Sequence, residues 1–278
     1  REQVIDALSQ AWLDGSSLRT YRHAPNAGPR KSWAAGDATS RAVRLADLTL
    51  RGEIGYPSVL TAPTWGFYDV SLKANSLSFP MSYGSYVMEN ILFKISFPAE
   101  FHSQTAAEAA VRLHPEVKDR LDEIEKIVIH THESAIRIIS KVGPLNNPAD
   151  RDHCLQYMTA VPLAFGNLVA ENYEDSFHRA NPVIDELREK MEVHENTQYS
   201  AEYLEADKRS IANCLQVFFK DGTATGAAEI HYPVGHRRRR EEGIPLLEEK
   251  FQSNLATRFP AKRCEEIYGL CKDQARLE

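Results

Sequence analysis

The spacing of apolar residues predicts helices toward both ends of the chain. Residues 1–13 place apolar side chains three and four positions apart, and Gly15 closes this segment. Residues 32–52 are small and apolar on one face and predict a packed helix. The same periodicity predicts further helices at 103–113, 135–141, 151–171, 182–190, 245–256 and 261–272.

The middle of the chain alternates apolar and polar residues, which is the pattern of half-buried strands. It predicts strands at 86–96, 123–131, 191–195, 211–219 and 227–232. The sequence therefore predicts a mainly α fold with an inserted α+β domain. An all-helical domain, formed by residues 1–85 and 236–278, would be interrupted by the α+β domain at 86–235.

Composition narrows the class of partner. The 278 residues are 42% hydrophobic and 26% charged, which is typical of a soluble globular protein. The net charge of −6 gives no general attraction to nucleic acid or to an anionic membrane. No apolar run approaches the roughly 20 residues that cross a bilayer. We therefore expect neither nucleic acid nor a membrane as a partner.

The four cysteines form no recognisable metal-binding pattern. They include no CxxC pair and no spacing typical of zinc or of an iron–sulfur cluster. We therefore expect no metal, and free, mostly buried thiols in a reducing compartment, at Cys154, Cys214, Cys264 and Cys271.

The segment FKISFPAEFHSQT, residues 93–105, brings three reactive types of side chain close together. It begins as a predicted strand with Lys94, stops at Pro98, and sets Glu100 and His102 just before an Ala-rich helix. Loops that enter helices often carry functional side chains, and a helix start favours a nearby anion. From the residues alone, chemistry and a merely polar loop are equally open.

Two other polar clusters favour a structural interpretation. The basic run in HRRRREEGIP, residues 236–245, continues directly into two glutamates. We predict a solvated loop or an intramolecular ion-pair cluster there rather than a nucleic-acid patch, with an anion clamp as the alternative. His130 and His132 stand two apart on a predicted strand, where they would share a face. Because no third ligand is implied, histidines at a strand edge are favoured over a metal site.

Arginine and tyrosine supply two further candidates. Arg41 and Arg44 lie one turn apart on an Ala-rich helix, and guanidinium groups suit carboxylates. An acid-binding site and ordinary salt bridges on the helix surface are equally open. Tyr157 lies among core residue types in DHCLQYMTAVPLAFG. The residues therefore favour a buried tyrosine whose hydroxyl bonds to a partner over a catalytic one.

Four long strings of the sequence carry a family resemblance. They are YGSYVMENILFKISFPAEFHSQTAAEAA, HTHESAIRIISKVGPLNNPADRDHCLQYMTAVPLAFGNLVAENYEDSFH, YLEADKRSIAN and YPVGHRRRREEGIPLLEEKF. Over its whole length the chain resembles the MmgE/PrpD family. The resemblance implies a hydro-lyase that removes water from 2-methylcitrate, a small tricarboxylate, to give 2-methyl-cis-aconitate in the methylcitrate cycle of propionate catabolism. It also implies a homodimer without a cofactor, in which the α+β domain is a lid.

The resemblance implies a set of substrate-binding residues. Arg41 matches a basic residue of the family at the start of a helix, with Arg44 or Lys31 as support for a carboxylate clamp. Lys94 matches a family lysine at the start of the lid and would hold a carboxylate.

The resemblance also implies catalytic residues. His102 matches a histidine at the start of the lid and would transfer a proton or orient the substrate, with Glu100 as the alternative match. Tyr157 matches the active-site tyrosine of the lid and would support an acid, which reverses the interpretation from the residues alone.

The family's earlier helical half, which carries an aspartate and histidines of the active site, has no counterpart before Arg1. We therefore expect a piece of a longer protein, with an incomplete site and the principal general base in that other half. The dehydratase would have side activity as a hydro-lyase on citrate or cis-aconitate. The alternatives are a cis-aconitate decarboxylase-like enzyme of the same family and an inactive piece with a structural or dimerising role. The expected location is the cytoplasm for a bacterial source, which we prefer, or the mitochondrial matrix for a fungal one.

Overall fold

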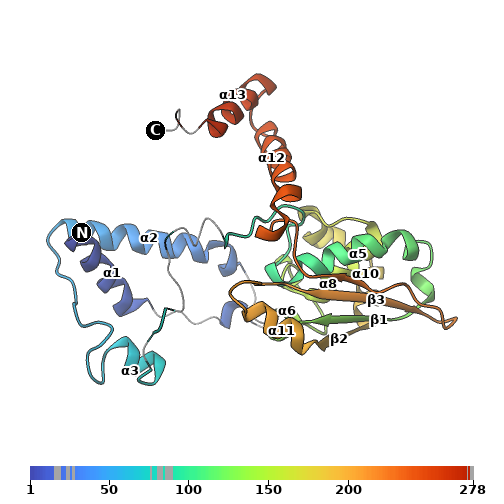
Figure 1. Ribbon diagram of the computed structural model, residues 1–278, viewed down its shortest axis with the longest axis horizontal. Coiled ribbons are helices and arrows are strands. Elements are labelled where there is room, and N and C mark those ends of the chain that lie inside the picture. Colours follow the sequence, from blue (N-terminus) through green and yellow to red (C-terminus); the bar gives the residue numbers. More distant parts are fainter. Residues whose placement is uncertain are drawn as a thin grey trace. The chain divides into compact units, whose positions relative to one another are not determined.

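The computed structural model describes residues 1–15, 20–22, 26, 29–75, 77–79, 84, 90–273 and 275. Contacts along the chain divide it into two compact units, Arg1–Gly84 and Ser85–Glu278 (Figure 1).

The first unit consists of helices and turns in its described residues. Its elements are α1 (Glu2–Asp14), η1 (Thr20–Arg22), α2 (Arg30–Leu50) and α3 (Phe67–Leu72). α1 packs against α2, and a buried amide joins them to the following turn. Nε2 of Gln10 donates to Oγ1 of Thr49 at 3.2 Å and to the carbonyl of Ile54 at 3.1 Å. The predicted helices at 1–13 and 32–52 are confirmed.

The second unit contains a four-stranded sheet in the order β2-β1-β3-β4. The strands are β1 (Ile124–Thr131), β2 (Met191–Glu195), β3 (Asn213–Phe219) and β4 (Ala228–Ile230). β1 is parallel to β2 and antiparallel to β3, which is antiparallel to β4. A parallel pair needs a long crossover connection, and the helices between β1 and β2 supply it.

Three helices cover one face of this sheet. They are α5 (Gln104–Val117), α8 (Leu155–Phe165) and α10 (Val183–Glu189), and Figure 1 shows them along the same side of the strands. α5 packs on β3, β4 and α8, and α10 packs on α8. Buried alanines let α5 lie close to its neighbours, at Ala106, Ala107, Ala109 and Ala110. The strands contribute fully buried aliphatic side chains to this core, at Ile127, Ile129, Leu215 and Val217. Each such side chain stabilises the fold by about 1.5–3 kcal/mol.

The remaining elements connect these layers and continue the chain beyond the sheet. They are η2 (Phe101–Ser103), η3 (Leu121–Glu123), α6 (Glu133–Ile139), α7 (Pro148–Arg151), η4 (Ala170–Tyr173), α9 (Asp175–Ala180), α11 (Thr197–Leu204), η5 (Arg237–Arg239), α12 (Arg240–Ala256) and α13 (Ala261–Lys272). α12 packs against α13, where the hydroxyl of Tyr268 donates to Glu248 at 2.6 Å. Within the described residues, no helix combines the length and the apolar character needed to cross a membrane.

Residues 90–96 form no strand, so the prediction for 86–96 is wrong there; the earlier residues of that range lie outside the described part. The backbone N–H of Phe93 donates to the carbonyl of Gly235 at 3.1 Å. Nζ of Lys250 donates to the carbonyls of Lys94 at 2.6 Å and Ile95 at 3.2 Å. A loop and a lysine from α12 thus satisfy backbone groups that a strand would have paired.

Other boundaries also differ from the prediction. The helix predicted at 151–171 is divided among α7, α8 and η4, because Gly166 ends α8 with a left-handed φ of 76°. α11 was not predicted, and the strand predicted at 227–232 is reduced to β4.

The coarse fold class is supported, since helices predominate and one small mixed sheet accompanies them. Residues 236–278 group with the sheet-bearing unit by their contacts. Their assignment to one helical domain with residues 1–85 stays a prediction.

Candidate active site

Hydrogen bonds fix the chain on both sides of His102. Nε2 of Gln104, in the first turn of α5, donates to the carbonyls of Phe97 at 3.0 Å and Ala99 at 2.8 Å. Nδ2 of Asn213 on β3 donates to the carbonyl of His102 at 2.9 Å. The turn η2 is therefore held between a helix and the sheet, which gives its side chains a defined position.

Glu100 and His102 form a close, largely buried pair. Nδ1 of His102 lies 3.0 and 3.1 Å from the two carboxylate oxygens of Glu100, which also accepts the backbone N–H of His102 at 2.8 Å. Burial by itself would raise the pKa of Glu100, but the hydrogen bonds and charge of His102 outweigh it and lower that pKa below its usual value. Glu100 is thus a carboxylate that accepts the Nδ1–H of His102 and orients its ring, an arrangement suited to general acid–base chemistry.

Two aromatic residues complete the surroundings of His102. The hydroxyl of Tyr203, on α11, lies 3.3 Å from Nε2 of His102. The ring of His132 stacks on that of Tyr203 with centroids 4.8 Å apart and lies 5.1 Å from the ring of His102. Burial, followed by the charge of His102, lowers the pKa of His132 to about 4. His132 is therefore uncharged at neutral pH.

His130 and His132 do not share a face, which corrects the prediction. β1 ends at Thr131, and His132 already belongs to the turn that begins α6. His132 is fully buried, whereas His130 is exposed on the sheet with its ring 5.7 Å from that of His194. Among the described residues, no three side chains of histidine, cysteine, aspartate or glutamate gather in a way that could hold a metal ion.

Tyr157 lies on α8 and belongs to the hydrophobic core. It is fully buried, and its hydroxyl donates to the carbonyl of Asn172 at 2.6 Å. Burial raises the pKa of Tyr157 to about 12. The next residue, Met158, contacts the site directly, because its Sδ accepts from the backbone N–H of Glu100 at 3.3 Å and from the hydroxyl of Ser103 at 3.1 Å. The contacts of Tyr157 are with Asn172, Tyr173 and His178, and its connection to Glu100 runs through Met158.

The predicted substrate-binding residues lie at the surface. Lys94 is exposed in the segment held by Gly235 and α12. Arg41 and Arg44 are exposed on α2, in the other unit, and Nε of Arg41 lies 3.9 Å from Asp37. The side chain of Lys31 lies outside the described part.

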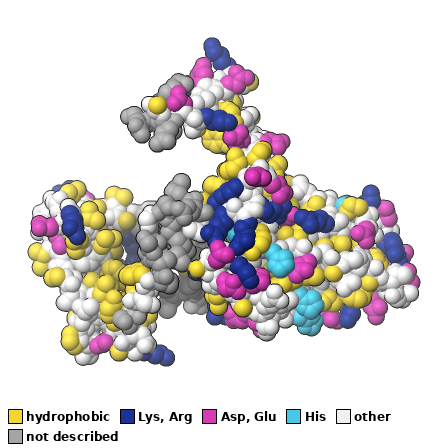
Figure 2. All heavy atoms as spheres, viewed as in Figure 1, with side chains coloured by type: hydrophobic (Ala, Val, Ile, Leu, Met, Phe, Trp, Pro, Cys, Tyr) yellow, Lys and Arg dark blue, Asp and Glu magenta, His cyan; other side chains and the backbone are white. Residues whose placement is uncertain are grey.

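The basic run 236–240 is an intramolecular ion-pair cluster, which confirms that interpretation. Arg237 and Arg238 both pair with Asp207. Arg239 pairs with Glu108 at 2.9 Å and with Glu242 at 2.6 Å. Figure 2 shows the Lys and Arg side chains gathered near the start of α12, with carboxylates among them.

The cysteines are free, as predicted, but only half of them are buried. Cys154 and Cys264 are buried, Cys214 is half-buried, and Cys271 is exposed.

Sequence reasoning missed Tyr203 and the role of His132 in the site. The one available signal was that both lie in the strings that carry the family resemblance, HTHESAIRI and YLEADKRSIAN. Their approach to His102 depends on where β1 ends and on the rotation of α11, neither of which the local pattern specifies.

The two units match two halves of one family description, in chain order. Residues 1–80 match the model of the MmgE/PrpD N-terminal domain, and residues 97–274 match that of the MmgE/PrpD C-terminal domain. The chain therefore belongs to the MmgE/PrpD family.

Curated relatives carry a consistent description. The chain is 58% identical over 281 residues to "2-methylcitrate dehydratase" of Escherichia coli (strain K12), covering 100% of this chain and 58% of the relative. It is 58% identical over 270 residues to "2-methylcitrate dehydratase, mitochondrial" of Yarrowia lipolytica, covering 96% of this chain and 52% of the relative. It is also 58% identical over 281 residues to "2-methylcitrate dehydratase" of Cupriavidus necator, covering 100% of this chain and 58% of the relative. The chain spans little more than half the length of the relatives it matches.

Proposed function

We propose that this chain is part of a hydro-lyase that converts 2-methylcitrate to 2-methyl-cis-aconitate in the methylcitrate cycle. The observation that carries the proposal is the Glu100–His102 pair, fixed by hydrogen bonds from α5 and β3. The names of the curated relatives supply the substrate and the reaction.

Removal of water from this substrate needs a proton at the departing hydroxyl and a base for the proton beside a carboxylate. His102, with Glu100 behind it, is suited to one of these transfers, and Tyr157 would support the pair through its neighbour in α8. Lys94, Arg41, Arg44 and Lys31 are candidates to hold the three carboxylates, since cationic side chains form strong charge-assisted hydrogen bonds with them.

The finer features of the fold and assembly are also part of the proposal. They are an all-helical domain with an inserted α+β lid, and a homodimer. The location would be the cytoplasm in a bacterium or the mitochondrial matrix in a fungus. The family resemblance supports each of them.

The test uses the complete protein that carries this chain, with 2-methylcitrate as substrate and the absorbance of the unsaturated product as the signal. His102→Ala should lower kcat by about 10²–10⁴-fold, which is the usual contribution of a general acid or base to the rate. His130→Ala is the matched control, because His130 is exposed on the sheet, and it should keep the wild-type kcat.

Binding is tested with Lys94→Gln, which should raise KM about tenfold, as expected for one charged hydrogen bond. Release of carbon dioxide from cis-aconitate, without dehydration, would favour the decarboxylase instead. No turnover of either acid by the wild-type protein would favour a structural role.

A further inference from the structure

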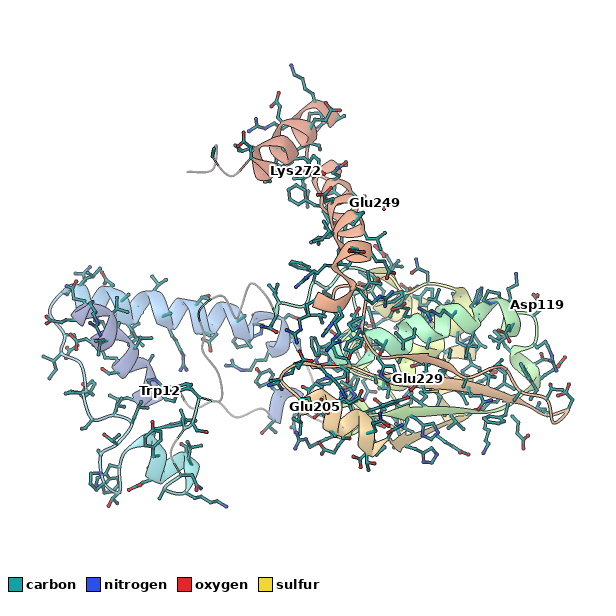
Figure 3. All side chains as sticks on the ribbon, in the orientation of Figure 1. Trp12, Asp119, Glu205, Glu229, Glu249 and Lys272 are labelled. Atoms are coloured by element: carbon teal, nitrogen blue, oxygen red, sulfur yellow. The ribbon has the colours of Figure 1, made fainter. Side chains whose placement is uncertain are left out.

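Tyr203 is held in place by the helix that carries it. α11 begins at Asn196, whose side chain accepts the backbone N–H groups of Gln198 at 3.0 Å and Tyr199 at 3.3 Å. The hydroxyl of Tyr199 donates to Glu229, which joins α11 to β4. Tyr203 lies one turn after Tyr199, in the last turn of α11. Figure 3 labels Glu205, which follows this helix, and Glu229.

His102 itself has little access to a substrate. Its exposed fraction is 6%, and both of its ring nitrogens are engaged, Nδ1 by Glu100 and Nε2 by Tyr203. Tyr203 is half-buried. The chain of hydrogen bonds that begins at the carboxylate of Glu100 therefore ends on a side chain, Tyr203, that is more exposed than the imidazole.

His132 holds the ring of Tyr203 by stacking. The two rings are 21° from parallel, and His132 is fully buried. Its Nε2 has no hydrogen-bond partner among the described residues, whereas its Nδ1 lies 3.4 Å from Oγ1 of Thr131, and the ring also forms a hydrogen bond with the backbone of Ala212. A buried, uncharged imidazole without a donor or acceptor at Nε2 serves here as an aromatic surface.

We propose that Tyr203 is a catalytic residue whose hydroxyl meets the departing hydroxyl of the substrate, and that His132 is its positioning residue. The proposal rests on the dehydratase function proposed above. It gives His102 the task of supplying protons to Tyr203 rather than to the substrate.

Dehydration moves two protons, one onto the departing hydroxyl and one away from the neighbouring carbon. The C–O bond breaks with its electron pair on oxygen, which takes the proton of the Tyr203 hydroxyl and leaves as water. The neighbouring C–H bond breaks, its electrons form the carbon–carbon double bond, and its proton goes to a second basic group. The oxygen of Tyr203 regains a proton from Nε2 of doubly protonated His102, which becomes neutral beside Glu100. Exchange with solvent then restores His102 and the second base.

The first experiment compares Tyr203 with a tyrosine outside the site in the complete protein. Tyr203→Phe should lower kcat on 2-methylcitrate by about 10²-fold or more, with KM and the melting temperature little changed. Tyr268→Phe is the control, because Tyr268 lies on α13 and its hydroxyl likewise donates to a glutamate, Glu248, at 2.6 Å, and it should keep the wild-type kcat. A Tyr203→Phe variant with the wild-type kcat would overturn the proposal.

The second experiment separates stacking from imidazole chemistry at His132. His132→Phe keeps an aromatic surface and should retain most of the wild-type kcat, whereas His132→Ala should lower kcat with KM nearly unchanged. Equal losses in both variants would show that the imidazole itself is needed and would refute the positioning role. A wild-type protein that does not dehydrate 2-methylcitrate would refute the proposed function, and this inference with it. Activity in the wild type together with unaffected Tyr203→Phe refutes only the inference.

Discussion

Nδ1 of His102 lies 3.0 Å from Oε2 of Glu100, and the same carboxylate accepts the backbone N–H of His102 at 2.8 Å. Glu100 thus both caps the turn η2 and holds the imidazole in it. Because one residue fixes both the backbone and the ring, the local fold and the proton chemistry at this position depend on the same charge.

Replacing Glu100 should change how stability depends on pH. A carboxyl group whose pKa is lowered by folding stabilises the protein above its ordinary pKa, and this contribution is lost as the pH falls through the lowered value. Glu100→Gln should therefore lose about 1.5–3 kcal/mol of unfolding free energy at neutral pH and much less in acid. Urea unfolding across a pH series measures this. Glu125→Gln, at an exposed position of β1, should follow the wild-type curve, and a constant difference for Glu100→Gln at all pH values would contradict the prediction.

Tyr157 and Tyr173 should respond differently to loss of their hydroxyls. The hydroxyl of Tyr157 donates to the carbonyl of Asn172, so Tyr157→Phe should cost about 1 kcal/mol of unfolding free energy and lower kcat. The hydroxyl of Tyr173 is buried without a hydrogen-bond partner among the described residues, so Tyr173→Phe should be neutral or stabilising. Urea unfolding and turnover of 2-methylcitrate test both. Wild-type kcat in Tyr157→Phe would remove Tyr157 from the proposed site.

Gly235 should tolerate no side chain. A Cβ at this position would lie 1.6 Å from the carbonyl oxygen of Phe93. Gly235→Ala should therefore destabilise by about 3 kcal/mol or more, because backbone must move and the segment before Pro98 loses its hydrogen bond. Gly269→Ala, in α13 with open space around its Cβ, should instead stabilise by about 0.5–1 kcal/mol through helix propensity. Thermal unfolding of both variants measures these effects. Equal unfolding midpoints would contradict the close approach of Gly235 to the carbonyl of Phe93.

Arg239 should contribute more stability than an exposed arginine. Its guanidinium pairs with Glu108 and Glu242 and donates to the carbonyl of Tyr232 at 2.7 Å, joining α5, α12 and the loop after β4. Arg239→Met should cost about 1–3 kcal/mol, because it leaves polar groups without their partner. Arg263→Met is the control, since Arg263 is exposed in an ordinary helical pair and should cost no more than about 0.5 kcal/mol. Equal losses of unfolding free energy in the two variants, measured by urea unfolding, would show that Arg239 contributes no more stability than an exposed arginine.

Much of the fold could be predicted where the pattern is local. The periodicity around Leu8 and the alternation in β1 indicated the right elements, because apolar residues repeat with the period of the structure they bury. The segment after Asn90 misled the prediction, because its apolar residues alternate like a strand. Its backbone instead bonds to Gly235 and Lys250, which are distant in sequence.

In the candidate site, too, features formed by residues close in sequence could be predicted, and contacts between residues distant in sequence could not. The short spacing of Glu100 and His102 places both in one candidate segment as alternatives, and only the structure shows that they pair. The contact of His102 with Tyr203 joins residues 101 positions apart. It could not be predicted, because α11 itself was not predicted.

The sequence by itself determined the balance of helix and strand, the candidate segment that holds Glu100 and His102, and the family resemblance, because each depends on residue types at short spacing. Only the tertiary structure decided that His132 turns inward while His130 stays on the sheet surface, and that Tyr203 lies over His102. The physical reason is that these contacts depend on where a strand ends and how a helix packs. Burial of the whole core sets both, and no local stretch of the chain determines either.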